Sequence, residues 1–221
     1  MNTRLITIIT AVVALIAIAG VFVFSRSQNT ANAAAVPQAT GELDLEGQPM
    51  LGDADAPVTL VAFEDFECSH CATFEENTFP TIERQFIENG QVKMYFVNHP
   101  LPAGPNSVIA ANASECALEQ SEEAFWDYKT VLYRSQRPGT NWASAANLVS
   151  LAEEYVPTLD SEALATCIEE DRHSELVQAE RNMGSAAGVQ GTPAVFLNGE
   201  LVADPRGNAL VADIEAALAN Q

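Results

Sequence analysis

The order of hydrophobic and polar residues along this chain predicts a sheet that begins with a strand, a helix and a second strand. Residues 58–64 are a run of β-branched and apolar side chains, which is typical of a buried strand. Residues 69–89 have helical spacing and end before Gly90, and Pro80 is expected to kink this helix because proline removes a backbone hydrogen bond. Residues 91–98 alternate apolar and other side chains and predict the second strand.

The long middle of the chain shows helical periodicity. Five segments place apolar residues three and four positions apart: residues 107–119, 122–134, 141–155, 160–170 and 172–187. Asn141 and Asp160 are expected to cap the N-termini of two of these helices, because a short polar side chain accepts hydrogen bonds from free backbone amides. Gly188 is expected to end the last of them.

Strand character returns near the C-terminus. Residues 194–197 and 200–202 flank Asn198-Gly199, a dipeptide that strongly favours a tight hairpin turn. Residues 208–219 then predict a last amphipathic helix.

The element order predicts an α/β fold whose sheet is interrupted by an all-helical block. Strands occur before and after the helical segments, and a single sheet requires both halves to pair. We therefore assign residues 51–102 and 189–221 to one sheet-containing domain and residues 103–188 to an inserted helical subdomain.

The N-terminus carries an apolar run at residues 5–24. A helix of this length spans about 30 Å, the thickness of the hydrocarbon core of a bilayer. We predict an uncleaved transmembrane anchor after a cytoplasmic stub of residues 1–4, followed by a flexible linker at residues 25–50. A cleaved signal peptide is the alternative, since Ala31-Asn32-Ala33 fits a signal peptidase site. In both cases the domain lies outside the cytoplasm, where disulfides persist.

The charge balance is strongly acidic. The chain has 30 acidic and 10 basic residues, a formal net charge of −20. Nucleic acid is therefore excluded as an expected partner, because binding its phosphates requires a basic face. A well-solvated acidic surface is the simplest interpretation, and a high-salt habitat is the alternative. With no dimerisation domain ahead of the fold, we expect a monomer.

The main candidate for chemistry is Cys68-Ser69-His70-Cys71, which follows the first strand and opens the first helix. A C-x-x-C pair at such a junction is typical of thiol–disulfide exchange. Backbone N–H groups at the helix N-terminus favour the thiolate of Cys68, and a protonated His70 would lower the pKa of that thiol further. Cys71, one turn on, suits the resolving role. The alternatives are a plain buried disulfide and a zinc site that adds His99, although structural zinc usually takes two separated ligand pairs.

Three further groups of residues occur with this pair, one directly before it and two after it in the chain. They are Phe63 to Glu67 directly before it, Ser114-Glu115-Cys116-Ala117 with Phe125-Trp126, and Gly191-Thr192-Pro193-Ala194. Together they resemble the DsbA-like thiol–disulfide oxidoreductases, from about residue 51 to the C-terminus. The resemblance implies a thioredoxin fold with a helical insertion, preceded here by the N-terminal transmembrane helix. It also implies a cis Thr192-Pro193 bond that lies against the C-x-x-C pair and binds extended substrate.

The resemblance implies a function as well. A thiolate of a reduced exported protein attacks Cys68 of the Cys68–Cys71 disulfide, and the disulfide passes to that protein. The reduced enzyme is reoxidised by a membrane-bound, quinone-coupled partner, and neither a metal nor an organic cofactor is needed. The alternatives are a thiol reductase or disulfide isomerase, and a chaperone-like binding module whose C-x-x-C pair is only structural.

One position departs from the family pattern. Related proteins often carry a buried acid where this chain has Ala62, and that acid helps to move the proton of the resolving thiol. Glu64 lies on the same face of the strand and is the candidate substitute, acting through water.

The remaining cysteines and histidines have structural interpretations. An even cysteine count outside the cytoplasm favours a bridge between Cys116 and Cys167. We expect a structural disulfide, with a second redox pair as the alternative. His99 is expected in a loop or in the core, and His173 has no obvious chemical partner. Phe125-Trp126 is expected to pack in the core.

Overall fold

The computed structural model describes residues 43–101, 104–137 and 139–221. Its elements in chain order are β1 (Met50–Leu51), β2 (Val58–Glu64), α2 (Ser69–Asn77), α3 (Phe79–Ile82), the π-helical turn η1 (Glu83–Ile87), β3 (Val92–Asn98), α4 (Pro105–Leu118), α5 (Glu122–Ser135), α6 (Ala145–Tyr155), α7 (Ser161–Glu169), α8 (Ser174–Ala186), β4 (Ala194–Leu197), β5 (Glu200–Leu201) and α9 (Gly207–Ala219). The predicted order of strands, helical block, hairpin and final helix is confirmed.

The strands form one sheet in the order β1-β3-β2-β4-β5. β2 pairs in parallel with β3, and α2, α3 and η1 supply the crossover that parallel neighbours require. β2 also pairs antiparallel with β4, so that Phe63 lies opposite Ala194. Because β4 follows the helical insertion, the two halves of the sheet meet across that insertion, as predicted.

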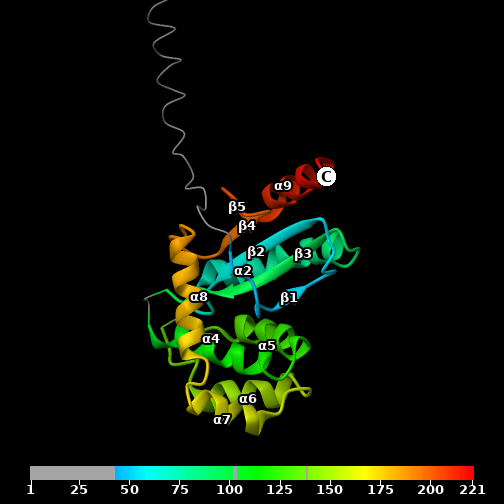
Figure 1. Cartoon of the computed structure of the whole chain (residues 1–221). Coiled ribbons are helices and arrows are strands. Elements are labelled where there is room, and N and C mark those ends of the chain that lie inside the picture. Colours follow the sequence, from blue (N-terminus) through cyan, green and yellow to red (C-terminus); the bar gives the residue numbers. More distant parts are fainter. Residues whose placement is uncertain (1–42, 102–103, 138) are drawn as a thin grey trace, which may run out of the picture. The chain divides into compact units, whose positions relative to one another are not determined.

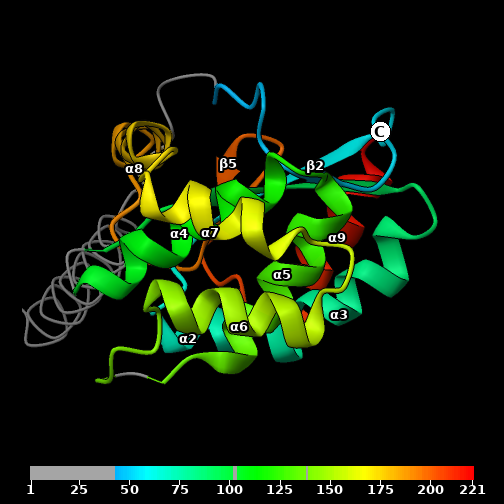
Figure 2. The ribbon, with the colours of Figure 1, turned by 90° about the horizontal axis from the view of Figure 1, so that it is seen from below.

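Helices cover both faces of the sheet, because alternate side chains of β2 point to opposite sides. Leu60 and Ala62 pack with α2, α3, η1 and α9 on one face. Val61 and Phe63 pack on the other face with residues at the end of α8. The helices α4 to α7 gather beside the sheet and form a core that also includes Phe66, Cys71 of α2 and Phe96 of β3 (Figure 1). Figure 2 shows the same helices from below, with α6 and α7 in front of α5.

The predicted helix at residues 69–89 is broken where proline enters it. α2 ends at Asn77, and α3 begins at Phe79 with Pro80 in its first turn, the position where the missing N–H costs least. η1 then closes with a hydrogen bond from Glu88 N to Glu83 O at 2.9 Å, five residues back. The predicted kink is confirmed, and the structure adds the interruption at Thr78.

The helix caps show one correct prediction and one error. The Asp160 side chain accepts hydrogen bonds from the backbone N–H groups of Glu162 and Ala163, as expected of an N-cap. The predicted cap Asn141 is wrong, because α6 begins later, at Ala145, and Ser144 supplies the capping oxygen.

The fold begins before the predicted boundary at Leu51. Leu43 and Leu45 pack against the core on the α8 side of the sheet, and Met50 pairs with Tyr95 of β3. Part of the predicted linker at residues 25–50 is therefore folded. The predicted anchor at residues 5–24 lies outside the described residues. None of the helices in the described part of the chain combines the length and the apolar composition that spanning a bilayer requires.

Candidate active site

The C-x-x-C pair lies at the junction of β2 and α2. Cys68 is the N-cap residue of α2, with extended backbone angles, and its carbonyl oxygen accepts hydrogen bonds from Cys71 N and Ala72 N at 3.1 and 3.2 Å. Both residues are free thiols in this structure. Cys68 is half-buried and Cys71 is fully buried, so one sulfur can be reached from outside and the other is held behind it.

The surroundings of Cys68 stabilise its thiolate. Its pKa is lowered to about 5, chiefly because the Cys71 thiol donates a hydrogen bond to it. The side chain of Thr192 and the backbone N–H groups of His70 and Cys71 lower the pKa as well, while partial burial opposes them. The sequence had predicted that a protonated His70 side chain lowers the pKa of Cys68. The contribution that the structure shows comes from the backbone N–H of His70.

The surroundings of Cys71 have the opposite effect. Burial raises the pKa of the Cys71 thiol well above its usual value, and its contacts with Cys68 and the charge of Glu64 raise it further. The pair therefore holds one thiolate and one thiol near neutral pH. This is the asymmetry that an attacking and a resolving cysteine require.

Glu64 is a buried acid beside this site. It is completely inaccessible at the end of β2, and the C-x-x-C pair follows within the same connection. Its pKa is raised well above the usual value, first by burial and then by the nearby carboxylate of Glu75. Ala62, on the same strand face, is buried in the apolar core. The predicted substitute for the missing acid thus lies close enough to Cys71 to influence its titration.

A buried ion pair adjoins Glu64. Lys129 Nζ lies 2.6 Å from Glu75 Oε2, with side chains only 1% and 6% exposed. The ammonium also lies 4.3 Å from the centre of the Phe79 ring and 4.8 Å from that of Trp126. Sequence reasoning missed Lys129. The signal was present, because this lysine occupies the apolar face of its helix, next to the buried Tyr128.

Thr192 and Pro193 lie directly against Cys68. The peptide bond between them is cis, as the resemblance implied, and Thr192 O accepts a hydrogen bond from Cys68 Sγ at 3.3 Å. A cavity of about 440 Å³ opens beside them, lined by His70 and Phe74 of α2 and by residues 203–207 among others. The half-buried Cys68 sulfur therefore lies against Thr192, which lines this cavity.

Comparison with known proteins places this arrangement in a family. The sequence model of a thioredoxin family matches residues 44–216. A probable disulfide bond formation protein D of Bacillus anthracis is 32% identical over 155 residues, which are 70% of this chain and 71% of that protein. The crystal structure of oxidised BdbD from Bacillus subtilis is similar with a TM-score of 0.76 and 29% identity, covering 82% of this chain and 98% of that one. The crystal structure of Chlamydia trachomatis DsbA has a TM-score of 0.69 and 25% identity, covering 78% and 90%.

This chain belongs to the DsbA-like thiol–disulfide oxidoreductases. Its fold is the thioredoxin fold with a helical insertion, and the C-x-x-C pair, the cis proline and the inserted helices all occur at the places that the sequence indicated.

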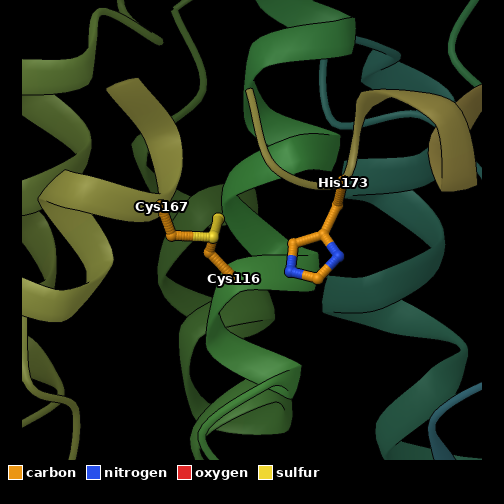
Figure 3. A group of neighbouring side chains, drawn as sticks. All are labelled: Cys116, Cys167 and His173. Carbon is orange, nitrogen blue, oxygen red and sulfur yellow. A yellow bond between two sulfur atoms is a disulfide. The ribbon is translucent and has the colours of Figure 1, made fainter. Parts of the chain in front are cut away.

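The second cysteine pair of this DsbA-like chain is a disulfide within the insertion. Cys116 of α4 and Cys167 of α7 are joined, with their Cα atoms 5.9 Å apart, and both are buried (Figure 3). The predicted pairing is confirmed. The His173 ring lies beside this bridge in Figure 3, and its Nε2 is 2.8 Å from Glu119 Oε2. The expectation that His173 has no obvious partner was wrong, because the fold brings Glu119, the residue after α4, to His173, the residue before α8.

His99 is a core residue, as expected. Its ring meets the Phe63 ring edge-on, with centroids 6.1 Å apart. Gly184 of α8 allows this packing, because a Cβ at that position would fall 2.5 Å from His99 Nδ1. Phe125 is also fully buried, in agreement with the prediction for the Phe125-Trp126 pair.

A second group of buried acids was not found from the sequence. Glu115 of α4 and Glu180 of α8 are each only 2% exposed, and Asn98 Nδ2 donates a hydrogen bond to Glu115 Oε1 at 2.7 Å. Burial raises the pKa of Glu115 to about 7, and burial together with the charge of Glu115 raises that of Glu180 to about 9. Among the described residues, the one group of cysteine, histidine and acidic side chains spaced for a metal ion is Cys116, Cys167 and His173, and its two sulfurs are already joined in the disulfide.

Proposed function

We propose that this enzyme is an extracytoplasmic oxidant that donates the Cys68–Cys71 disulfide to reduced cysteines of exported proteins. The observation that carries the proposal is the low pKa of Cys68, about 5, beside a Cys71 whose pKa is raised. A stabilised thiolate favours the reduced form of the enzyme, and an enzyme that prefers to be reduced is a strong oxidant.

The chemistry proceeds by two successive thiol–disulfide exchanges, the first at Cys68 Sγ and the second at the client sulfur bound to it. A client thiolate attacks Cys68 Sγ of the disulfide, forming a mixed disulfide and releasing Cys71 as a thiolate. Because its surroundings raise its pKa, Cys71 takes up a proton, for which the buried carboxyl of Glu64 is the neighbouring source. A second client thiolate then attacks the client sulfur and displaces the Cys68 thiolate. Two electrons have passed from the client to the enzyme.

The cis-proline groove supports the client during this step. The Thr192 carbonyl already accepts a hydrogen bond from the Cys68 thiol, so a client sulfur on Cys68 lies beside this backbone. The cavity next to Pro193 gives the flanking client residues room on that side. Thr192 and Pro193 are therefore the proposed substrate-binding pair.

The decisive experiment is the equilibrium of the Cys68–Cys71 pair with glutathione. An oxidant of exported proteins is expected to have a reduction potential less negative than about −180 mV. A potential near that of thioredoxin, about −270 mV, would instead indicate the reductase or isomerase alternative. The Cys116→Ala/Cys167→Ala variant is the control that assigns the measured potential to Cys68 and Cys71.

The cellular setting is part of the same proposal. Residues 5–24 anchor the chain in the membrane, the domain works as a monomer outside the cytoplasm, and a membrane-bound, quinone-coupled protein takes the electrons from the reduced pair. The long apolar run and the second disulfide support this location. Extraction of cell membranes at alkaline pH tests the anchor: full-length protein is expected to stay with the membranes, and a shortened soluble form would contradict it.

A further inference from the structure

A second, larger cavity lies away from the cis-proline groove. It measures about 830 Å³ and is lined by the end of α5, by Arg137 and Thr140 to Trp142 of the connection that follows, and by residues along α6 as far as Tyr155 at its end. Its volume is in the range of ligand pockets, roughly 300–1,000 Å³. It shares no lining residue with the cavity beside Pro193, and the chemistry of Cys68 does not use it.

The charge of this cavity is opposite to that of the chain. Arg134 and Arg137 line it, and its other lining residues are all uncharged, although the chain has 30 acidic and only 10 basic residues. Neither arginine forms an ion pair with a residue that the structure describes. Arg137 Nη1 donates hydrogen bonds to the carbonyls of Arg134 and Gln136, which fixes its guanidinium at the C-terminus of α5. The side chains that line this cavity therefore carry a net positive charge, which favours a negatively charged ligand.

The same cavity offers an aromatic and aliphatic lining. Trp142 and Tyr155 line it together with Val131 and Leu151. Tyr155 is 57% exposed, which is unusual for a large apolar side chain in this fold, and the buried Trp142 Nε1 has no hydrogen-bond partner among the described residues. Trp, Tyr and Arg are the residue types that dominate the energy of protein–protein contacts.

Gln136 and Thr140, in the connection between α5 and α6, are linked by hydrogen bonds to the residues directly before Cys68. Gln136 Nε2 donates a hydrogen bond to Phe66 O at 2.6 Å. Asn106 Nδ2 donates both to Glu67 Oε1 and to Thr140 O, each at 2.8 Å, and Thr140 lines the cavity. A polypeptide held at Cys68 therefore has this loop beside it, on the insertion side of the sulfur.

We propose that this cavity is a second binding site for client protein, which takes a segment with carboxylates next to an aromatic or aliphatic side chain. The proposal rests on the proposed function, since it assumes that clients dock at Cys68. Glu154 lies beside one end of this cavity, where it is hydrogen-bonded to the Tyr155 side chain, so the carboxylates of the bound segment are placed at Arg134 and Arg137 instead. Charges beyond about 8 Å are largely screened at physiological ionic strength. The two arginines then attract the carboxylates of an acidic client at this cavity, whereas the rest of the acidic surface repels them.

Binding can be tested without any redox step. The probe is a short cysteine-free peptide that alternates Asp with Tyr and Leu, and its control carries Asn in place of Asp. The full chain has two tryptophans, so NMR of the indole N–H groups reports Trp142 in the cavity and Trp126 outside it. We expect the acidic peptide to shift the Trp142 signal and to bind about tenfold more tightly than its control. A shift of Trp126 alone, no shift, or equal binding of both peptides would overturn the proposal, as would a Trp142 shift caused by protein concentration alone.

Charge reversal gives the matched comparison. Arg134→Glu is expected to weaken binding of the acidic peptide about tenfold, and Arg134→Gln to weaken it less. Arg84→Glu makes the same change of charge at an exposed residue of η1 outside the cavity and is expected to leave binding unchanged. If Arg134→Glu does not fold, Arg134→Gln decides alone. Equal effects at Arg134 and Arg84 would contradict the site, whereas a failed glutathione titration would contradict only the oxidase function.

Discussion

The two cysteine pairs of this protein consist of the same side chains but differ in their surroundings and in their state. Cys68 and Cys71 enclose two residues at the start of a helix, are free thiols, and have pKa values shifted in opposite directions. Cys116 and Cys167 are 51 residues apart, join two helices and are buried as a disulfide. The comparison teaches that an exchange site needs one reachable, stabilised thiolate, whereas a bridge needs only the right geometry and exclusion of solvent.

The largest expected effect is the loss of the exchange site itself. Replacing Cys68 with alanine removes the sulfur that clients attack, so oxidation of a reduced client peptide should fall at least about 10³-fold, to the uncatalysed rate. The Cys116→Ala/Cys167→Ala variant should retain turnover at a temperature where it is folded. Substantial turnover without Cys68 would assign the activity to the second pair and reverse the comparison.

Removal of the bridge should change stability rather than chemistry. A bridge that closes a loop of 51 residues contributes about 4 kcal/mol on the chain-entropy model. The Cys116→Ala/Cys167→Ala variant should therefore lose about that much free energy of unfolding in urea, while the pKa of Cys68 stays the same. An altered Cys68 titration in the folded variant would show that the two pairs are coupled.

The asymmetry within the first pair predicts a pH profile. In the reduced enzyme, alkylation of Cys68 should be half-maximal at pH about 5. At pH 7 its thiolate fraction should exceed that of an ordinary thiol, with a pKa of about 8.5, by more than tenfold. Because the folded pKa is lowered, the stability that this thiolate gives to the reduced fold is complete above the unfolded pKa and is lost as the pH falls through about 5. Rapid alkylation followed by mass spectrometry measures the profile, and a midpoint near pH 8.5 would contradict it.

The smallest expected effect concerns the proton of Cys71. Glu64→Gln keeps the shape of the buried side chain and removes its proton, so release of Cys71 from the disulfide should slow about tenfold, below the 10²–10⁴-fold typical of general acid–base catalysis. The effect is moderated because Glu75 lies beside Glu64. Stopped-flow fluorescence of client oxidation measures the rate. Glu115→Gln, a change at another buried acid, is the control, and equal slowing in both variants would refute a specific role for Glu64.

Local sequence patterns were enough to predict most of the fold and part of the site. The apolar run of β2, the Asn198-Gly199 turn, which has positive φ at both residues, and the cap at Asp160 depend on neighbours in sequence, and all were predicted correctly. The misplaced cap Asn141 shows the limit, since several short polar residues in that loop could serve and only the packing of α6 selects Ser144.

The features that the sequence did not predict depend on contacts between residues far apart in the chain. The Lys129–Glu75 pair, the Glu119–His173 pair and the buried Glu115 and Glu180 each join residues from different elements. No local spacing encodes such pairs, because their partners meet only once the insertion has packed.

The sequence by itself determined that this protein has a C-x-x-C pair at a strand–helix junction, a downstream Thr-Pro and a helical insertion, because each is a local pattern of residue types. The tertiary structure decided how that pair is tuned. It brings Thr192 O to 3.3 Å from Cys68, buries Cys71, and seals Glu64 beside Lys129 and Glu75. A thiol's pKa depends on burial and on charges within a few ångströms, and these are properties of the packed fold rather than of sequence spacing.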